Sequence, residues 1–281
     1  MAPTVSVPGA TLAYDVAGPS SAPAVLFVHA GVATRAMWDP QFEDLARDHR
    51  VVRYDTRGYG DSPGEAVPYS EVDDLLRVLD ASAVERAVVV GASRGGEFAL
   101  DAALAHPDRV TGLVLIGAAP SGMTDDGIPY TENERALERA AEEAEAAEDV
   151  DALVRIEVQL WDLGPDRDSD EVDPDFLERA IELNVGAAHW DFAGTATAPV
   201  RPAIDRLAEV TAPTLVVIGD HDVTDARMAA ELLLAGIPHA EPARFTDSAH
   251  LPSVEHPERF TALLRAWLAR LPGGAADGPR A

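Results

Sequence analysis

The chain of 281 residues contains no cysteine. This absence excludes disulfide bonds, thiolate metal sites and a cysteine nucleophile. No apolar run approaches the roughly 18 residues that a bilayer-spanning segment needs. The first residues, Met-Ala-Pro-Thr-Val, also lack the basic and then apolar pattern of a secretion signal. We therefore expect a cytoplasmic protein that does not bind membranes.

Positive charge is scarce as well. Lysine is absent, and 22 arginines face 49 acidic residues, which gives a net charge of -27. Such a balance disfavours nucleic acid and anionic membranes as partners, because both bind basic surfaces. Adaptation to salt could explain the missing lysine. Codon bias in a GC-rich genome is the favoured explanation, since it also accounts for the abundant alanine, arginine, aspartate and glutamate.

What is present indicates a globular protein. The chain is 47% hydrophobic and 25% charged, which is typical of soluble domains. Its length can accommodate one large α/β domain with an insertion and a sizeable core. We find no internal repeat.

Short apolar runs alternate with helical patterns along most of the chain. Strands are predicted at residues 5–7, 12–16, 24–28, 51–54, 87–90, 113–116, 214–218 and 244–246, and helices at residues 38–48, 72–79, 93–106, 225–235 and 257–271. This alternation predicts a mostly parallel central sheet flanked by helices. In such sheets, ligands bind at the carboxyl ends of the strands.

One segment, residues 121–202, breaks the alternation. It contains no convincing strand but three helical stretches, at residues 132–148, 150–163 and 176–187. We predict a helical lid inserted after the sixth strand, since insertions at this edge tend to cover a site. The alternative is a solvated acidic appendage. The core domain would then comprise residues 1–120 and 203–271, and residues 272–281 would form a disordered tail.

The most informative motif lies at residues 88–96, Val-Val-Val-Gly-Ala-Ser-Arg-Gly-Gly, followed by a helical pattern. A serine on a tight strand-to-helix turn presents its hydroxyl at the carboxyl edge of the sheet. A β-carbon at Gly91 or Gly95 would crowd this turn. We therefore predict that Ser93 is a nucleophile.

A serine nucleophile needs a base, and the base needs a carboxylate partner. His250 lies in a loop between a late strand and the last helix, whereas His106 and His256 precede prolines at helix boundaries. We predict His250 as the base. The strand at 214–218 leads into Gly-Asp-His-Asp, so Asp222 is the predicted acid and Asp220 the reserve.

The oxyanion of a tetrahedral intermediate needs hydrogen-bond donors. One predicted donor is the backbone N–H of Arg94, which follows the nucleophile. The second comes from the loop after the strand at 24–28, where Gly31 is the better candidate and Val32 the next. We expect His29 to brace this loop rather than to react.

These motifs resemble the α/β-hydrolase superfamily, in its lid-bearing esterase, lactonase and haloperoxidase-like branch, over nearly the whole chain. The family pattern Asp-x-Arg-Gly-x-Gly-x-Ser is matched by residues 55–62, and its Gly-x-x-Asp acid loop by Gly219 and Asp222. The family's His-Gly oxyanion motif is altered to His29-Ala30-Gly31. Arg94 stands where the family often has methionine. Its side chain could pair with the lid, meet a substrate carboxylate or be solvated.

The resemblance implies the α/β-hydrolase fold and a cofactor-free serine hydrolase. We predict cleavage of a small to medium apolar ester or lactone through an acyl-enzyme on Ser93, with anionic substrates disfavoured by the surrounding charge. No metal-ligand cluster or cofactor motif stands out. The predicted pocket walls are Val32, Trp38, Met123, Trp161, Trp190 and Phe192. The alternative is that most of these residues are simply part of the core.

Two alternatives stay open. The same three residues catalyse hydrolysis of carbon–carbon bonds in diketones elsewhere in this superfamily. A ligand receptor or a non-hydrolytic biosynthetic protein could also retain the triad. The sequence leaves both the substrate and the choice between monomer and homodimer open.

Overall fold

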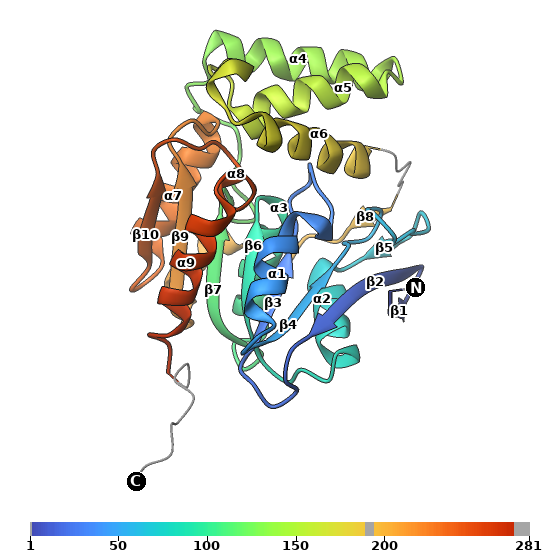
Figure 1. Ribbon diagram of the computed structural model, residues 1–281, viewed down its shortest axis with the longest axis vertical. Coiled ribbons are helices and arrows are strands. Elements are labelled where there is room, and N and C mark those ends of the chain that lie inside the picture. The colour runs from blue at the N-terminus through green and yellow to red at the C-terminus, as the bar shows by residue number, and fades with distance from the viewer. Residues whose placement is uncertain (1, 189–193, 273–281) are drawn as a thin grey trace.

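The computed structural model of the protein describes residues 2–188 and 194–272. In this part of the chain the main sheet has eight strands in the order β1-β2-β4-β3-β6-β7-β9-β10 (Figure 1). The strands are β1 (Thr4–Val7), β2 (Ala10–Ala17), β3 (Ala24–Val28), β4 (Arg50–Tyr54), β6 (Ala87–Ala92), β7 (Val110–Ile116), β9 (Thr214–Gly219) and β10 (Glu241–Phe245).

The sheet is mostly parallel, as predicted. Only the β1–β2 and β2–β4 pairs are antiparallel, and all pairs from β4 to β10 are parallel. Every residue of β6 and β9 is buried. This burial on both faces explains why these central strands are continuous apolar runs.

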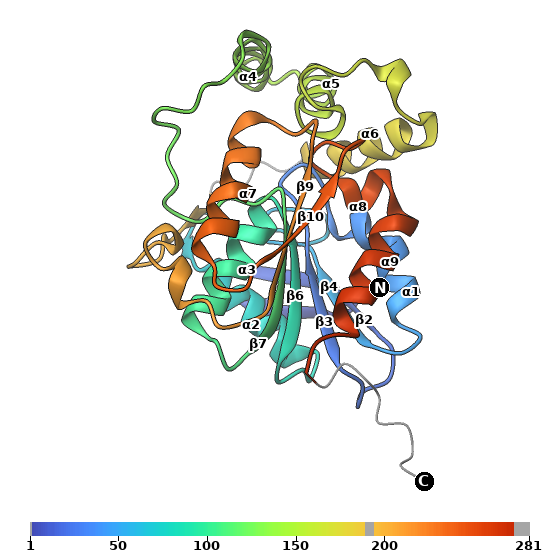
Figure 2. The ribbon, with the colours of Figure 1, turned by 90° about the vertical axis from the view of Figure 1, so that its left-hand side faces the viewer.

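Helices cover both faces of the sheet (Figure 2). One face carries α1 (Asp39–Leu45), α8 (Pro252–Glu255) and α9 (Pro257–Leu268), and the other carries α2 (Glu71–Ala81), α3 (Arg94–Ala105) and α7 (Thr224–Gly236). A separate apolar cluster fills each side. Short 3₁₀ turns precede α1 at Arg35–Trp38 and β9 at Ala203–Asp205 and Leu207–Glu209.

The inserted helices lie over the carboxyl ends of the strands (Figure 1). They are α4 (Glu132–Ala146), α5 (Val150–Glu157) and α6 (Pro174–Ala188), with a short 3₁₀ turn at Ser169–Glu171. The segment has its own small core around Val154, Phe176 and Ala180. Thr131 and Glu134 form a capping box that starts α4.

Two details differ from the sequence prediction. The helix expected over 150–163 widens to a π-helix at Val158–Leu163, where the Gln159 amide donates to the carbonyl oxygens of Gly164 and Arg167. A two-residue strand β8 (Thr195–Ala196) pairs with β5 (Pro68–Tyr69). A strand of two residues is too short to show periodicity, so no sequence pattern predicts this pair.

Some predictions fall outside the described residues, namely Trp190, Phe192 and residues 273–281 of the expected tail. No helix among the described residues has both the length and the apolar character needed to span a membrane.

Candidate active site

Ser93 occupies the turn between β6 and α3 with φ 51° and ψ −123°. This conformation is rare for a residue with a β-carbon and costs on the order of 1–3 kcal/mol. The backbone N–H of Ser93 donates to the Ile116 carbonyl at 2.7 Å, which ties the turn to β7. Although Ser93 is the N-cap residue of α3, its side chain does not cap the helix. The helix therefore leaves the hydroxyl available for chemistry.

The glycines around Ser93 are required by close backbone contacts. A β-carbon on Gly91 would lie 2.3 Å from the Gly95 carbonyl oxygen, and one on Gly95 would lie 2.5 Å from the His29 carbonyl oxygen. The prediction that a β-carbon would crowd this turn is confirmed. The second contact also shows that the loop containing Gly31 packs directly against the serine turn.

His250 and Asp222 form a buried pair. The His250 Nδ1 atom lies 2.9 Å from Asp222 Oδ1 and 3.0 Å from Asp222 Oδ2. Asp220, the reserve candidate, points elsewhere and accepts from Arg244 at 2.7 Å. A carboxylate on Nδ1 leaves Nε2 as the nitrogen that can accept a proton.

This pair lies at the same end of β7 as Ser93. A β-carbon on Gly117 would be 2.8 Å from His250 Nδ1 and 3.1 Å from Asp222 Oδ2. Gly117 directly follows Ile116, whose carbonyl accepts the hydrogen bond from Ser93 N–H. Three residues from loops after β6, β9 and β10 therefore gather around one strand end.

Several carboxylates set the charge of His250. Burial lowers the pKa of His250, but the Asp222 carboxylate, assisted by Asp225 and Asp162, raises it by more, so the net pKa lies above its ordinary value. A base with a raised pKa accepts a proton more readily. The same shift makes the imidazole unavailable as a base at acidic pH.

The inserted helices contact His250 directly. The His250 backbone N–H donates to the Trp161 carbonyl at 3.2 Å, and the two rings are 4.9 Å apart. The neighbouring Asp162 is fully buried and accepts from Asn184 Nδ2 at 2.9 Å. Burial raises the pKa of Asp162 to about 7.

The loop after β3 is braced by His29, as predicted. The Thr56 backbone N–H donates to His29 Nε2 at 2.9 Å, so the ring proton is on Nδ1, which donates to the Ala30 carbonyl at 2.7 Å. Burial lowers the pKa of His29, which favours this neutral form. Val32 is buried in the core.

The Arg94 side chain pairs with the core rather than with the inserted helices. Its Nη2 atom donates to Glu71 Oε1 at 2.6 Å and to the Tyr69 hydroxyl at 3.3 Å. Two of the alternatives for the Arg94 side chain, an ion pair with the lid and a fully solvated side chain, were therefore wrong. Only 30% of the Arg94 side chain is exposed. Its partners come from α2 and β5, which are distant from Arg94 in the sequence. Burial raises the pKa of Glu71 to about 7 despite the opposing effect of Arg94.

Four of the residues predicted as pocket walls, Val32, Trp38, Met123 and Trp161, lie in the described part of the chain. Trp38 is fully buried in the core between Phe27 and Phe260, at centroid distances of 4.8 and 6.3 Å, so its assignment as a pocket wall was wrong. Its large apolar ring fills the space between β3 and α9 instead. Met123 is partly buried in the loop after β7. Trp161 packs against His250, one of the predicted catalytic residues.

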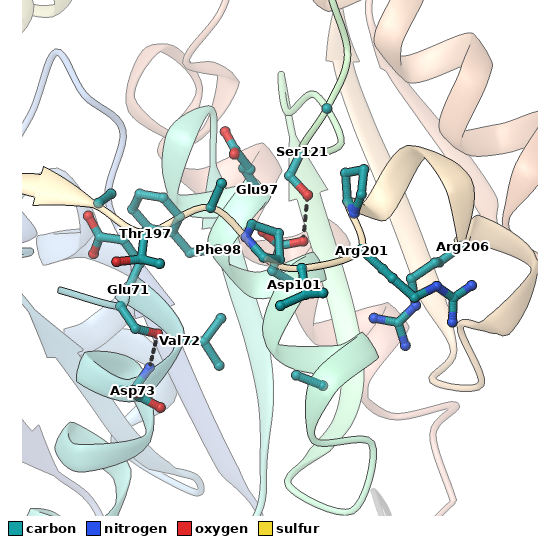
Figure 3. Close-up of a pocket in the computed structure, with 18 of the residues that line it drawn as sticks. Glu71, Val72, Asp73, Glu97, Phe98, Asp101, Ser121, Thr197, Arg201 and Arg206 are labelled. Atoms are coloured by element: carbon teal, nitrogen blue, oxygen red, sulfur yellow. Dashed lines mark hydrogen bonds between the residues drawn. The ribbon is translucent and has the colours of Figure 1, made fainter. Parts of the chain in front are cut away.

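A cavity of about 830 Å³ lies along α2 and α3 (Figure 3), and Ser93, Asp222 and His250 are not among the residues that line it. Its walls combine the apolar Val72 and Phe98 with acidic and basic side chains, namely Glu71, Asp73, Glu97, Asp101, Arg201 and Arg206. None of the four described residues predicted as pocket walls lines it.

The cavity follows one face of α3. Glu97 and Asp101 lie four and eight residues after Ser93, which is the spacing of a single helix face. That spacing is the sequence signal by which Glu97 and Asp101 could have been found. Ser121 donates to Asp101 at 2.7 Å (Figure 3) and accepts from the Ala203 backbone, so it ties the returning chain to α3.

The Asp-x-Arg-Gly-x-Gly-x-Ser motif at residues 55–62 has a structural role. Asp55 is fully buried and accepts from the backbone N–H groups of Arg35 and Asp61. Arg57 forms a buried two-point contact with Asp74, at 2.9 Å for both bonds. Among the described residues, no group of three or more potential ligands is arranged to hold a metal ion.

Comparisons with known proteins agree with this geometry. A family model described as alpha/beta hydrolase fold matches residues 23–257. A 3-oxoadipate enol-lactonase of Acinetobacter baylyi is 27% identical over 92% of this chain and 94% of its own length. A 2-hydroxymuconate semialdehyde hydrolase of a Pseudomonas species is 31% identical over 87% of this chain and 85% of its own.

A solved structure of a thermophilic esterase from Thermogutta terrifontis superposes with a TM-score of 0.75, at 26% identity. The match covers 95% of this chain and 96% of that chain. The parallel sheet, the serine turn and the family match lead to one conclusion: the chain belongs to the α/β-hydrolase fold family.

Proposed function

We propose that this protein is a serine hydrolase that cleaves a carboxylic ester or a lactone. The observation that carries the proposal is the gathering of Ser93, His250 and Asp222 at the end of β7, with His250 Nδ1 already bound to Asp222. The relatives named as an enol-lactonase and an esterase support this class of substrate.

The reaction proceeds in two halves. The Ser93 hydroxyl attacks the carbonyl carbon while His250 Nε2 takes its proton, and Asp222 stabilises the resulting imidazolium. The oxyanion accepts from the backbone N–H groups of Gly31 and Arg94. When the tetrahedral intermediate collapses, the leaving oxygen receives the proton from His250. A water molecule, deprotonated by His250, then releases the acyl group from Ser93 and restores the enzyme.

We also propose that residues 121–202 act as a lid over a core of residues 1–120 and 203–271. Trp161, which contacts His250 from the inserted helices, supports this role. The cavity along α3 reaches Glu97, one helical turn after Ser93, and is the proposed site for one part of the substrate. The net charge of -27 favours a neutral substrate over an anionic one.

A substrate screen with a matched variant tests the proposal. Wild-type protein is assayed against p-nitrophenyl esters, lactones and vinylogous diketones, in parallel with Ser93→Ala. We expect turnover of esters or lactones that falls by at least 10³-fold in Ser93→Ala. Ester turnover that is unchanged in the variant would contradict the proposal.

A second candidate function is hydrolysis of a carbon–carbon bond. The likeness to a 2-hydroxymuconate semialdehyde hydrolase favours it, because that compound contains no ester bond. Preferential turnover of the diketones, again dependent on Ser93, would select this function. Tight retention of one equivalent of product without turnover would instead indicate a ligand receptor.

A further inference from the structure

Tyr59 lies in a rigid turn after β4. Its backbone N–H donates to the Thr56 carbonyl at 3.0 Å, and its carbonyl accepts from Ser62 N–H at 2.9 Å. The Asp55 carboxylate closes the same turn by accepting from Asp61 N–H at 2.9 Å. The turn therefore holds the Tyr59 side chain in a defined position.

The Tyr59 hydroxyl faces the loop that is proposed to bind the oxyanion. A β-carbon on Gly31 would lie 3.7 Å from Tyr59 Oη, and within 4 Å of no other atom of the described residues apart from its own chain neighbours. The phenol ring also packs against His29, with centroids 5.1 Å apart. Apart from this hydroxyl, the space beside Gly31 is open.

The side chain of the other proposed donor, Arg94, packs against the same phenol ring. The guanidinium carbon of Arg94 is 5.2 Å from the centre of the Tyr59 ring. Glu71 and Tyr69 fix the guanidinium from behind. The phenol therefore lies next to Gly31 and contacts the side chain of Arg94, the two residues whose backbone N–H groups would bind the oxyanion. A nearby cation also makes a phenol O–H a stronger donor.

We infer that the Tyr59 hydroxyl is a third donor to the oxyanion of the tetrahedral intermediate on Ser93. This inference rests on the proposed function. The phenol donates a hydrogen bond and keeps its proton, so no group is transferred to or from it. Its contribution is realised only in the transition state, where negative charge accumulates on the substrate oxygen.

The Tyr59→Phe variant tests the inference, because phenylalanine keeps the ring that packs against His29 and Arg94. We expect kcat for p-nitrophenyl butyrate to fall by about 10- to 100-fold, with KM changed by less than about threefold. An alkyl trifluoromethyl ketone forms a tetrahedral adduct with a serine nucleophile. Its inhibition constant should rise in proportion to the loss of kcat/KM.

Tyr14→Phe is the matched control. It removes a hydroxyl that donates to the Ala81 carbonyl at 3.3 Å, at the opposite end of α2 from Glu71. We expect a small loss of thermal stability and unchanged kcat. This control separates the loss of a structural hydrogen bond from the loss of a catalytic one.

The outcomes are distinguishable. Tyr59→Phe with wild-type kcat, or with reduced kcat but an unchanged inhibition constant for the ketone, would overturn the inference and leave the proposed function intact. A wild-type protein that neither turns over esters nor forms the ketone adduct would overturn both.

Discussion

At the scale of single residues, the His250–Asp222 pair determines how the site responds to pH. Since Asp222 and its acidic neighbours raise the pKa of His250, the imidazole is protonated at acidic pH and cannot act as a base. We expect kcat/KM to rise with pH through an apparent pKa above 6.5, the ordinary value for histidine. A pH–rate profile between pH 5 and 9 measures it.

Replacing the acid tests the role of the pair. Asp222→Asn should lower kcat by about 10⁴-fold, because the imidazole then adopts the wrong tautomer. It should also move the acidic limb of the pH profile to lower pH. Asp220→Asn is the matched control, since Asp220 contacts Arg244 on the surface, and should change kcat by less than about twofold. Equal losses in the two variants would show that the acid is not Asp222.

At the scale of elements, the serine turn depends on close packing of β6 and α3. Gly95→Ala should destabilise the protein by about 1–3 kcal/mol or more, because the new β-carbon would overlap the carbonyl oxygens of Val28 and His29. Gly31→Ala is the control, because its β-carbon would meet nothing closer than 3.7 Å. Denaturant unfolding compares the two variants. Similar free energies of unfolding would contradict the packing argument.

The buried Asp162 makes the stability of the inserted helices depend on pH. Its pKa is raised from 3.8 to about 7, so the folded state favours the neutral acid. The stability due to this group is fully present below about pH 4 and is lost as the pH rises through about 7. Asparagine does not ionise, so the Asp162→Asn variant does not lose stability in this way. The free energy of unfolding of the variant minus that of wild type should therefore increase between pH 5 and 8, by at most about 4 kcal/mol. A difference that does not vary with pH would contradict the assignment.

Sequence patterns predicted the elements that carry long periodic or apolar signals. The central strands, the serine turn and the three inserted helices all belong to this group. Contacts made only by tertiary folding were not predictable. Glu71 and Tyr69 approach Arg94 from elements more than twenty residues away, and the cavity is closed by residues 196–202 of the returning chain. Trp38 was misassigned because an aromatic residue in a core and one in a pocket wall look alike in a sequence.

At the scale of the whole molecule, the net charge of -27 should destabilise the folded state through self-repulsion. Salt screens such repulsion, with a Debye length that falls to about 3 Å at 1 M. We expect the melting temperature at pH 7.5 to rise by several degrees between 0.05 and 1 M NaCl. Near the isoelectric point of about 4.4 the rise should largely disappear. A melting temperature that falls with salt at pH 7.5 would mean that ion pairs outweigh the repulsion.

The most direct measurement is covalent labelling of the intact protein with a fluorophosphonate, followed by mass spectrometry of the whole chain and of its peptides. The account predicts one adduct per chain, located on Ser93, with labelling that is lost in Ser93→Ala and strongly slowed in His250→Ala. A folded wild-type protein that stays unlabelled, or that carries the adduct on another residue, would contradict it.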